Sequence, residues 1–363
     1  MLEAHHHQYQ YRPLVICLLA GLSFITVCRL RMGTTGGLSS PDGGPDSGGD
    51  PSMAVPPLGA VPGPYQPLVA SNVSTSPLPY DVTEGALGVA DRSQLIDLGN
   101  FSFLMNDAAA NACHGNATPM LVTLVHSSPA HHLHRDAIRQ VCSEQMNVVF
   151  LVGETSDNAT QQQQLEAENE VHGDIVQGSF RDTYRNLTYK HVMGLKWVAY
   201  HCPRVRYVIK TDDDVFVNTN NLHRFLNERL SPLGVRRLIM CQLWEGSVVK
   251  RSYRSKWRVS PEEYAGRFYP GYCPGWAVIY SPDVVLLLYR QAQRTPFFWI
   301  DDVHVTGTLV AAANLTHTPL PQPYLWTDDR DVMQQHRNSF LFYLMDQQQF
   351  KDLHQVQHSL PFS

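Results

Sequence analysis

Tyr207-Val-Ile-Lys-Thr-Asp-Asp-Asp-Val-Phe-Val217 sets three consecutive carboxylates between two apolar runs. An apolar strand beginning at Tyr207 would deliver Asp212, Asp213 and Asp214 to its carboxyl end. Adjacent carboxylates repel one another, and such hard oxygen ligands suit Mg²⁺ or Mn²⁺, which can also bridge the phosphates of a nucleotide. The pattern therefore indicates a cation site, with a solvated acidic turn as the alternative from this feature alone.

The residues before this segment alternate between strand and helix patterns. We expect strands at residues 120–126, 148–152 and 174–177 and helices at residues 134–142, 161–172 and 186–200. This βαβ order predicts an α/β fold with a mostly parallel central sheet, in which ligands bind beyond the carboxyl ends of the strands. The three aspartates fall at that edge, which favours the cation site over the solvated turn.

The N-terminus carries an almost unbroken apolar run over residues 14–28. The run is shorter than the roughly 20 residues that cross an average bilayer, although thinner membranes and tilt relax that limit. A bulky, basic Arg29-Leu-Arg-Met32 follows it instead of a small-residue cleavage site, so we expect a single-pass signal anchor rather than a cleaved signal peptide. Arginines stand on both sides of the run, so charge does not orient it.

Composition changes again after the apolar run. From residue 33 to about residue 79, Gly, Pro, Ser and Asp dominate, and large apolar side chains are too few to offset the entropy of ordering. We therefore expect a cytoplasmic tail at residues 1–13, a transmembrane signal anchor at 14–28, a flexible lumenal stem at 29–100 and one large domain at 101–363.

Sequons and cysteines indicate the secretory lumen. Six Asn-x-Ser/Thr sequons lie beyond the apolar run, at residues 72, 100, 116, 158, 186 and 314. Five cysteines also follow it, so at most two intrachain disulfides form and one thiol is left over, with the pairing open. The net charge of −5 comes without a basic patch, so no nucleic-acid partner is expected.

A family resemblance rests on several motifs that follow one another between residues 101 and 320. They are Arg135-Asp-Ala-Ile-Arg139, Arg181-Asp-Thr-Tyr-Arg-Asn-Leu-Thr-Tyr-Lys190, Gly194-Leu-Lys-Trp197, His201-Cys-Pro203, the segment 207–218, Tyr269-Pro-Gly-Tyr-Cys-Pro-Gly275, and Trp299-Ile-Asp-Asp-Val303 with Thr306-Gly307. Together they resemble the β-1,3-galactosyltransferase family, glycosyltransferase family 31. The resemblance implies a GT-A fold and a type II Golgi membrane enzyme whose lumenal domain, residues 101–363, inverts the anomeric centre of a UDP-sugar.

The resemblance also implies roles for individual residues. Asp212 and Asp214 match the family's metal-binding Asp-x-Asp, with Mn²⁺ as the expected cofactor, and Asp213 would hold the ribose or a coordinated water. Asp302 matches the base that takes the acceptor proton. Arg135 and Arg139 resemble a basic pair near the nucleotide. Each role has a plainer alternative, since carboxylates often cap helices and arginines four apart often form a solvated helix face.

Departures from the family pattern affect the same regions. Gln140-Val-Cys142 stands where Thr-Trp is usual, Gly275-Trp-Ala277 replaces Gly-x-Gly, and Asp301 replaces a Glu. The family's C-terminal metal-binding His aligns with Tyr343, so we assign that ligand to His336 nearby. Without either, the metal would bind more weakly.

Three functions are compatible with these residues. The first is a β-1,3-hexosyltransferase that moves galactose, or else N-acetylglucosamine or N-acetylgalactosamine, from a UDP-sugar to a glycoprotein or glycolipid acceptor, as a monomer or homodimer. The second is a non-catalytic Golgi relative acting as a glycan-binding or chaperone module. The third is a metal-dependent phosphohydrolase, which the order of the acidic motifs disfavours.

Overall fold

The computed structural model describes residues 89–108, 113, 119–142, 146–155, 159–321, 324–327 and 339–343. No helix within these ranges is both long and apolar enough to cross a membrane. The expected tail, the anchor at residues 14–28, the stem up to residue 88 and His336 lie outside the described residues.

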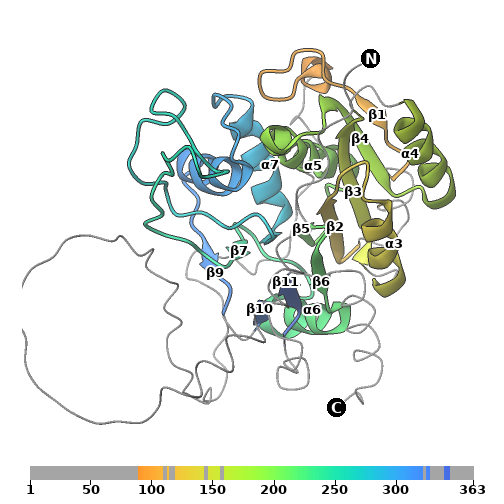
Figure 1. Cartoon of the computed structure of the whole chain (residues 1–363). Coiled ribbons are helices and arrows are strands. Elements are labelled where there is room, and N and C mark those ends of the chain that lie inside the picture. The colour runs from red at the N-terminus through yellow and green to blue at the C-terminus, as the bar shows by residue number, and fades with distance from the viewer. Residues whose placement is uncertain are drawn as a thin grey trace, which may run out of the picture. The chain divides into compact units, whose positions relative to one another are not determined.

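The predicted parallel sheet forms the centre of the fold (Figure 1). It runs in the order β1-β4-β3-β2-β5-β8-β7-β9, and β4, β3, β2 and β5 are mutually parallel. Antiparallel strands flank these four strands. Strand β1 pairs antiparallel with β4, and β8 pairs antiparallel with both β5 and β7. The strands are β1 Phe103–Met105, β2 Leu121–His126, β3 Val148–Glu154, β4 Ile175–Arg181, β5 Tyr207–Asp212, β7 Ile239–Cys241, β8 Ala277–Tyr280 and β9 Thr318–Pro319.

A second, three-stranded sheet continues directly from the acidic triplet. Strand β6, Val215–Val217, pairs antiparallel with β11, Leu341–Tyr343, which pairs parallel with β10, Leu325–Thr327. The register sets Val215 opposite Tyr343, at the position where the resemblance leads us to expect a metal-binding His. This part of the C-terminal region therefore returns to the strand that follows the aspartates.

Helices cover both faces of the large sheet (Figure 1). Val149 and Leu151 of β3 pack in one apolar cluster with α5 (Leu187–His201) and α7 (Pro282–Ala292). Phe150 and Val152 point the other way, into a cluster with α3 (His132–Val141) and α4 (Ala159–His172). This alternation is the two-residue period of a strand that is buried on both faces.

Shorter helical elements complete the domain, and one glycine sets a helix against the sheet. They are η1 Val89–Ser93, η3 Tyr184–Asn186, α6 Thr219–Phe225, η4 Leu226–Leu230, α8 Asp301–Val303, η5 His304–Thr308 and α9 Leu309–Ala312. A Cβ at Gly194 would lie 2.5 Å from Leu151 Cδ1, so only glycine lets α5 approach β3 this closely.

The folded domain begins earlier than the sequence suggested. Leu95 and Ile96 are buried in the same cluster as α5 and α7, although we assigned residues up to 100 to the stem. Lys196 Nζ donates hydrogen bonds to the backbone oxygens of Asp91, Arg92 and Gln94, at 2.7 to 2.9 Å. Residues 89–100 therefore belong to the domain, because they supply both apolar contacts and acceptors for a largely buried ammonium.

Two disulfides agree with the expected cysteine count. Cys113 pairs with Cys202, and Cys241 pairs with Cys273. Cys142 at the end of α3 is the thiol left over. The second bridge ties β7 to the segment that precedes β8, close to the candidate site.

Candidate active site

The acidic triplet lies where the sequence predicted, at the carboxyl end of β5. Asp212 is the last residue of the strand, and β6 begins at Val215. The turn between them is fixed through the backbone, since Asp213 N donates to His126 O at 3.1 Å and Asp212 N donates to Trp276 O at 3.3 Å. The three carboxylates thus leave the sheet at a defined edge, yet each meets a different environment.

Asp213, the central member, is anchored within the protein. Ser127 Oγ donates to Asp213 Oδ2 at 2.7 Å, and His131 Nδ1 lies 2.8 Å from the same oxygen. Burial alone would raise the pKa of Asp213, but the bonds from His131 and Ser127 outweigh it and hold that pKa below its usual value. Asp213 therefore fixes the turn as an ionised acceptor.

Arg135 and Arg139 are already engaged by protein groups. The fully buried Arg135 bonds both carboxylate oxygens of Glu168 at 2.7 Å and donates to Ser127 Oγ at 3.0 Å. Arg139 bonds Glu168 and both oxygens of Asp174, each at 2.8 Å. Through Ser127, Arg135 supports the anchor of Asp213, while the expected contact of either arginine with a nucleotide stays a prediction.

Asp212 is paired with a buried lysine from its own strand. Lys210 Nζ donates to Asp212 Oδ1 at 2.7 Å and also to the backbone oxygen of Gly275. Burial lowers the pKa of Lys210, but the nearby carboxylates of Asp212, Asp301 and Asp302 outweigh it and raise that pKa. Burial raises the pKa of Asp212 to about 6, against the opposing effect of Lys210.

Asp214 is the member of the triplet with a free acceptor. Its Oδ1 is buried and has no hydrogen-bond partner among the described residues. Burial and the neighbouring Asp213 charge raise the pKa of Asp214. An orphaned carboxylate oxygen beside a second carboxylate fits a hard cation, because a divalent ion would supply the missing partner. The described residues contain no group of three or more His, Cys, Asp or Glu side chains arranged to hold a metal.

A second carboxylate pair, Asp301 and Asp302, opens helix α8. His191 Nδ1 lies 3.3 Å from Asp301 Oδ2, and His191 Nε2 lies 3.1 Å from the Tyr280 hydroxyl. A neutral imidazole can donate to Asp301 through Nδ1 and accept from Tyr280 at Nε2. Burial alone would raise the pKa of Asp301, but the bond from His191 and the charge of Lys210 lower it.

The pKa of Asp302 is shifted in the opposite direction to that of Asp301. Burial and the adjacent Asp301 charge raise the pKa of Asp302 to about 7. Its Oδ1 accepts a hydrogen bond from Val303 N at 2.8 Å, but Ile300 is the N-cap of α8, so Asp301 and Asp302 lie inside the helix and the helix-capping alternative is not met. A carboxyl that titrates near neutral pH can exchange a proton under physiological conditions.

Gly275 brings the two carboxylate clusters together. A Cβ at Gly275 would lie 3.6 Å from Lys210 Nζ, 3.7 Å from Asp302 Cβ and 4.0 Å from Asp301 Oδ2. Lys210, which bonds both Asp212 and the Gly275 carbonyl, therefore stands between the triplet and the Asp301–Asp302 pair. The site is a single constellation of five carboxylates, of which one side chain in each cluster is held by a histidine.

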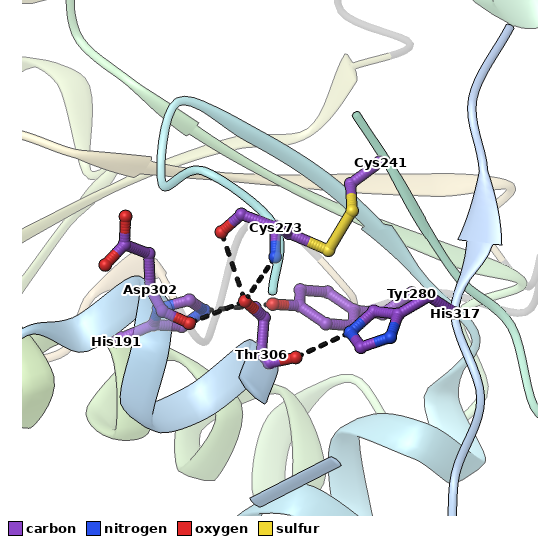
Figure 2. The surroundings of a disulfide bond; sticks show 7 residues. All are labelled: His191, Cys241, Cys273, Tyr280, Asp302, Thr306 and His317. Atoms are coloured by element: carbon purple, nitrogen blue, oxygen red, sulfur yellow. Dashed lines mark hydrogen bonds between the residues drawn. A yellow bond between two sulfur atoms is a disulfide. The ribbon is translucent and has the colours of Figure 1, made fainter. Parts of the chain in front are cut away.

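Thr306 links the backbone of Asp302 to Cys273 of the second disulfide (Figure 2). The Thr306 hydroxyl donates to the backbone oxygen of Asp302 at 2.6 Å and accepts from Cys273 N at 2.8 Å. His317 Nε2 lies 2.6 Å from the Thr306 backbone oxygen. Figure 2 shows the Asp302 carboxylate pointing away from this network, which leaves it accessible to a partner outside the scaffold.

A family model described as galactosyltransferase matches residues 133–321, just over half of the chain. The match includes both carboxylate clusters. The chain belongs to the galactosyltransferase family.

Individual relatives of this galactosyltransferase-family member agree. The human acetylgalactosaminyl-O-glycosyl-glycoprotein β-1,3-N-acetylglucosaminyltransferase is 33% identical over 309 residues, which cover 80% of this chain and 77% of the relative. Mouse β-1,3-galactosyltransferase 1 is 34% identical over 59% of this chain and 66% of its own length. Chimpanzee β-1,3-galactosyltransferase 5 is 37% identical over 52% of this chain and 64% of its own. The chain thus spans about two thirds of the two galactosyltransferases.

Solved structures add less. The apo structure of the bifunctional glycosyltransferase WbbM is 10% identical, covers 69% of this chain and 51% of its own, and has a TM-score of 0.38. A value this low carries no argument, so the mixed α/β fold rests on the topology described above.

Four residues that support the site in this family member were not predicted from sequence. The sequence patterns assign no role to Lys210, although it lies in the strand before the aspartates, and they assign none to Ser127, His131 or His191. A lysine inside an apolar strand, two residues before the aspartates, was a usable signal for Lys210, because buried lysines need a partner. His191 gave no such signal, since its partner Asp301 is 110 residues away in sequence.

Proposed function

We propose that this protein is an inverting β-1,3-glycosyltransferase with a GT-A type fold, which moves a hexose from a UDP-sugar to a hydroxyl of an acceptor glycan. The observation that carries the proposal is the state of Asp302. Its carboxyl is half-buried, has a pKa raised to about 7 and lies beside Gly275, whose backbone oxygen accepts from the same Lys210 that pairs with Asp212.

Asp302 would act as the base. An inverting transfer needs no protein nucleophile, only a group that removes the acceptor proton while the hydroxyl attacks from the face opposite the leaving nucleotide. A base with a pKa near the working pH combines availability with driving force. Asp301 tunes this base, because its negative charge, stabilised by His191, opposes ionisation of Asp302.

The residues that would hold the expected Mn²⁺ are Asp214, through its unpartnered Oδ1, and Asp212. The ion would supply Lewis-acid stabilisation of the charge that develops on the departing diphosphate. Lys210 orients Asp212 and adds a buried positive charge on the same side of the site. Both bonds to Asp213 fall on Oδ2, so its expected contact with the ribose or a coordinated water would fall to Oδ1.

Galactose is the first donor sugar we propose, with N-acetylglucosamine next. Two of the named relatives are β-1,3-galactosyltransferases, and the relative matched over the longest span is a β-1,3-N-acetylglucosaminyltransferase. We propose a glycoprotein or glycolipid acceptor and residence in the Golgi membrane with the domain in the lumen. The six sequons support the compartment.

A non-catalytic relative is the second candidate, and one observation favours it. The described residues offer Asp212 and Asp214 but no third ligand grouped with them, and Lys210 already neutralises Asp212. Such a protein would bind a UDP-sugar weakly without turning it over.

An assay of sugar transfer with each donor separately distinguishes the enzyme from the non-catalytic relative. The lumenal part of the chain, beginning before residue 89 and secreted from a eukaryotic host, is given each UDP-sugar with Mn²⁺ and a panel of β-linked acceptors. If the protein is the proposed enzyme, the parent should transfer a sugar, and both Asp214→Ala and Asp302→Asn should abolish the transfer. Binding of UDP without transfer, by a folded protein and with every donor, would instead support the non-catalytic relative, and release of inorganic phosphate would point to a phosphohydrolase.

A further inference from the structure

Two aromatic side chains from separate segments form an exposed, hydrogen-bonded pair. Tyr184 in η3 is 49% exposed and Trp257, in the long connection between β7 and β8, is 45% exposed. Trp257 Nε1 donates to the Tyr184 hydroxyl at 2.9 Å. Because that hydroxyl accepts from Trp257, its own proton stays available to donate to another molecule. Two large rings held together in water are unusual without a partner.

The pair stands beside the catalytic carboxylates. The Tyr184 ring centroid lies 6.2 Å from that of Trp299, which is two residues before Asp301. Arg185 holds the segments together, since its guanidinium lies 4.3 Å over the Trp299 ring and it also pairs with Glu263. After burial, the charges of Asp301, Asp302 and Asp212 contribute most to the raised pKa of Tyr184, which agrees with this proximity.

Two buried polar groups in the same region lack partners. Trp299 Nε1 and the Tyr269 hydroxyl form no hydrogen bond within the described part of the chain, although their side chains are only 4% and 8% exposed. Both residues belong to one apolar cluster with Val303, the neighbour of Asp302. Buried donors are normally paired, so these two groups leave hydrogen-bonding capacity that a bound ligand or an ordered water would satisfy.

We propose that Tyr184 and Trp257 form the subsite for the acceptor sugar, binding one pyranose ring by its C–H face. This inference rests on the proposed transferase function and deepens it. An aromatic face contacts the C–H face of a sugar by dispersion and excludes water from it, while the Tyr184 hydroxyl donates to a ring substituent. Tyr184 lies against Trp299, two residues before Asp301, so a ring bound at this subsite would present its hydroxyls on the side of the Asp301–Asp302 pair. The residues proposed to hold the donor are those of the acidic triplet, so the two substrates should respond to different substitutions.

The test separates acceptor from donor binding. Trp257→Ala should raise the acceptor KM for p-nitrophenyl β-galactoside or p-nitrophenyl β-N-acetylglucosaminide by about tenfold, a typical value for losing one aromatic contact, and leave the Kd for UDP unchanged. Trp257→Phe should restore much of the loss by keeping a ring. Tyr253→Ala is the matched control, because Tyr253 is an 87% exposed aromatic in the same connection. Each ring has a cation over it, Arg258 at Tyr253 and Lys256 at Trp257, whereas the hydrogen bond to Tyr184 comes from Trp257. The control should leave both constants unchanged.

Saturation-transfer NMR with methyl β-galactoside and methyl β-N-acetylglucosaminide, in the presence of UDP and Mn²⁺, keeps this test independent of turnover. Glycoside binding by the parent that Trp257→Ala loses supports the subsite even if no sugar is transferred, in which case only the proposed reaction fails. An unchanged acceptor KM or NMR signal in a folded Trp257→Ala protein overturns the subsite. So does an equal loss of UDP binding, or a parent that binds neither glycoside.

Discussion

The acidic triplet and the Asp301–Asp302 pair are two carboxylate clusters with similar hydrogen-bonding arrangements and different proposed roles. Each holds one member ionised through a histidine, Asp213 by His131 and Asp301 by His191. The remaining members have raised pKa values. In the triplet they are Asp212, which pairs with Lys210, and Asp214, whose Oδ1 lacks a partner among the described residues; in the pair it is Asp302, whose pKa is raised to about 7.

The two clusters differ in which ion can neutralise the negative charge of the carboxylates that no histidine holds. The triplet can gather two carboxylate oxygens on one cation, which removes the repulsion between them. In the pair, His191 lies against Asp301 Oδ2 and the Asp301 charge raises the pKa of Asp302, so a proton is the natural partner of Asp302. Residue type is the same in both clusters, so under the proposed function their hydrogen-bond partners would decide whether a carboxylate binds a metal or a proton.

The largest effect should follow removal of the proton acceptor. Asp302→Asn keeps the shape and the bond to Val303 N but cannot take a proton, so sugar transfer should fall by roughly 10²- to 10⁴-fold. Steady-state transfer assays measure this, and titration calorimetry should find UDP binding within about twofold of the parent. A variant that still transfers at the parental rate would remove Asp302 from the role of base.

Replacing two neighbours within the triplet should separate binding from folding. Asp214→Ala removes an oxygen without a protein partner, so Mn²⁺-dependent UDP binding should weaken by at least about tenfold while the free energy of unfolding stays near that of the parent. Asp213→Ala leaves Ser127 and His131 without their acceptor and should cost about 1–3 kcal/mol of stability. Titration calorimetry measures UDP binding, and urea unfolding measures the free energy of unfolding. Equal changes in the free energy of unfolding of the two variants would contradict the distinction.

The pH dependence tests the influence of Asp301 on its neighbour. Because Asp302 must be ionised to act as a base and its pKa is raised to about 7, kcat/KM should be complete above that pH and fall about tenfold per pH unit below it. Asp301→Asn removes the adjacent negative charge, so the pKa of Asp302 should drop and the acidic limb should move to lower pH. A limb that stays in place, or moves to higher pH, would show that Asp301 does not set this pKa.

The smallest effect should come from the thiol outside both clusters. Burial raises the pKa of Cys142 to about 12, so the folded protein should not react with a thiol reagent at neutral pH. Cys142→Ala should leave transfer unchanged within about twofold. Rapid labelling of the native protein, or loss of activity in the variant, would indicate that Cys142 lies closer to the chemistry than its position on α3 suggests.

Local patterns predicted the sheet but not the contacts that tune the site. The strands at residues 120–126, 148–152 and 207–212 and the helix at 186–200 were readable because apolar periodicity is a local property. The turn of π-helix over His304–Thr308 was not, since nothing in its sequence distinguishes it from an α-helix. Residues 89–100 looked like stem because their role depends on Lys196, a distant partner.

The same limit applies to the functional residues. Asp212, Asp214 and Asp302 could be named from motifs, because acidic residues after a strand or opening a helix are conspicuous. The opposite pKa shifts of Asp301 and Asp302 depend on His191 and Lys210, which reach them only through the tertiary fold. The use of Arg135 and Arg139 by Glu168 was likewise hidden, since α4 carries no motif.

The most direct test of the central claim is the structure of the product, determined by NMR after incubation of the parent protein with UDP-galactose or UDP-N-acetylglucosamine, Mn²⁺ and a β-linked acceptor. Both donors carry an α-linked sugar. The account predicts a product with a new β linkage to position 3 of the acceptor sugar. An α-linked product would contradict inversion and the role of Asp302 as base, and a folded protein that forms no product with any donor would contradict the assignment of an enzyme.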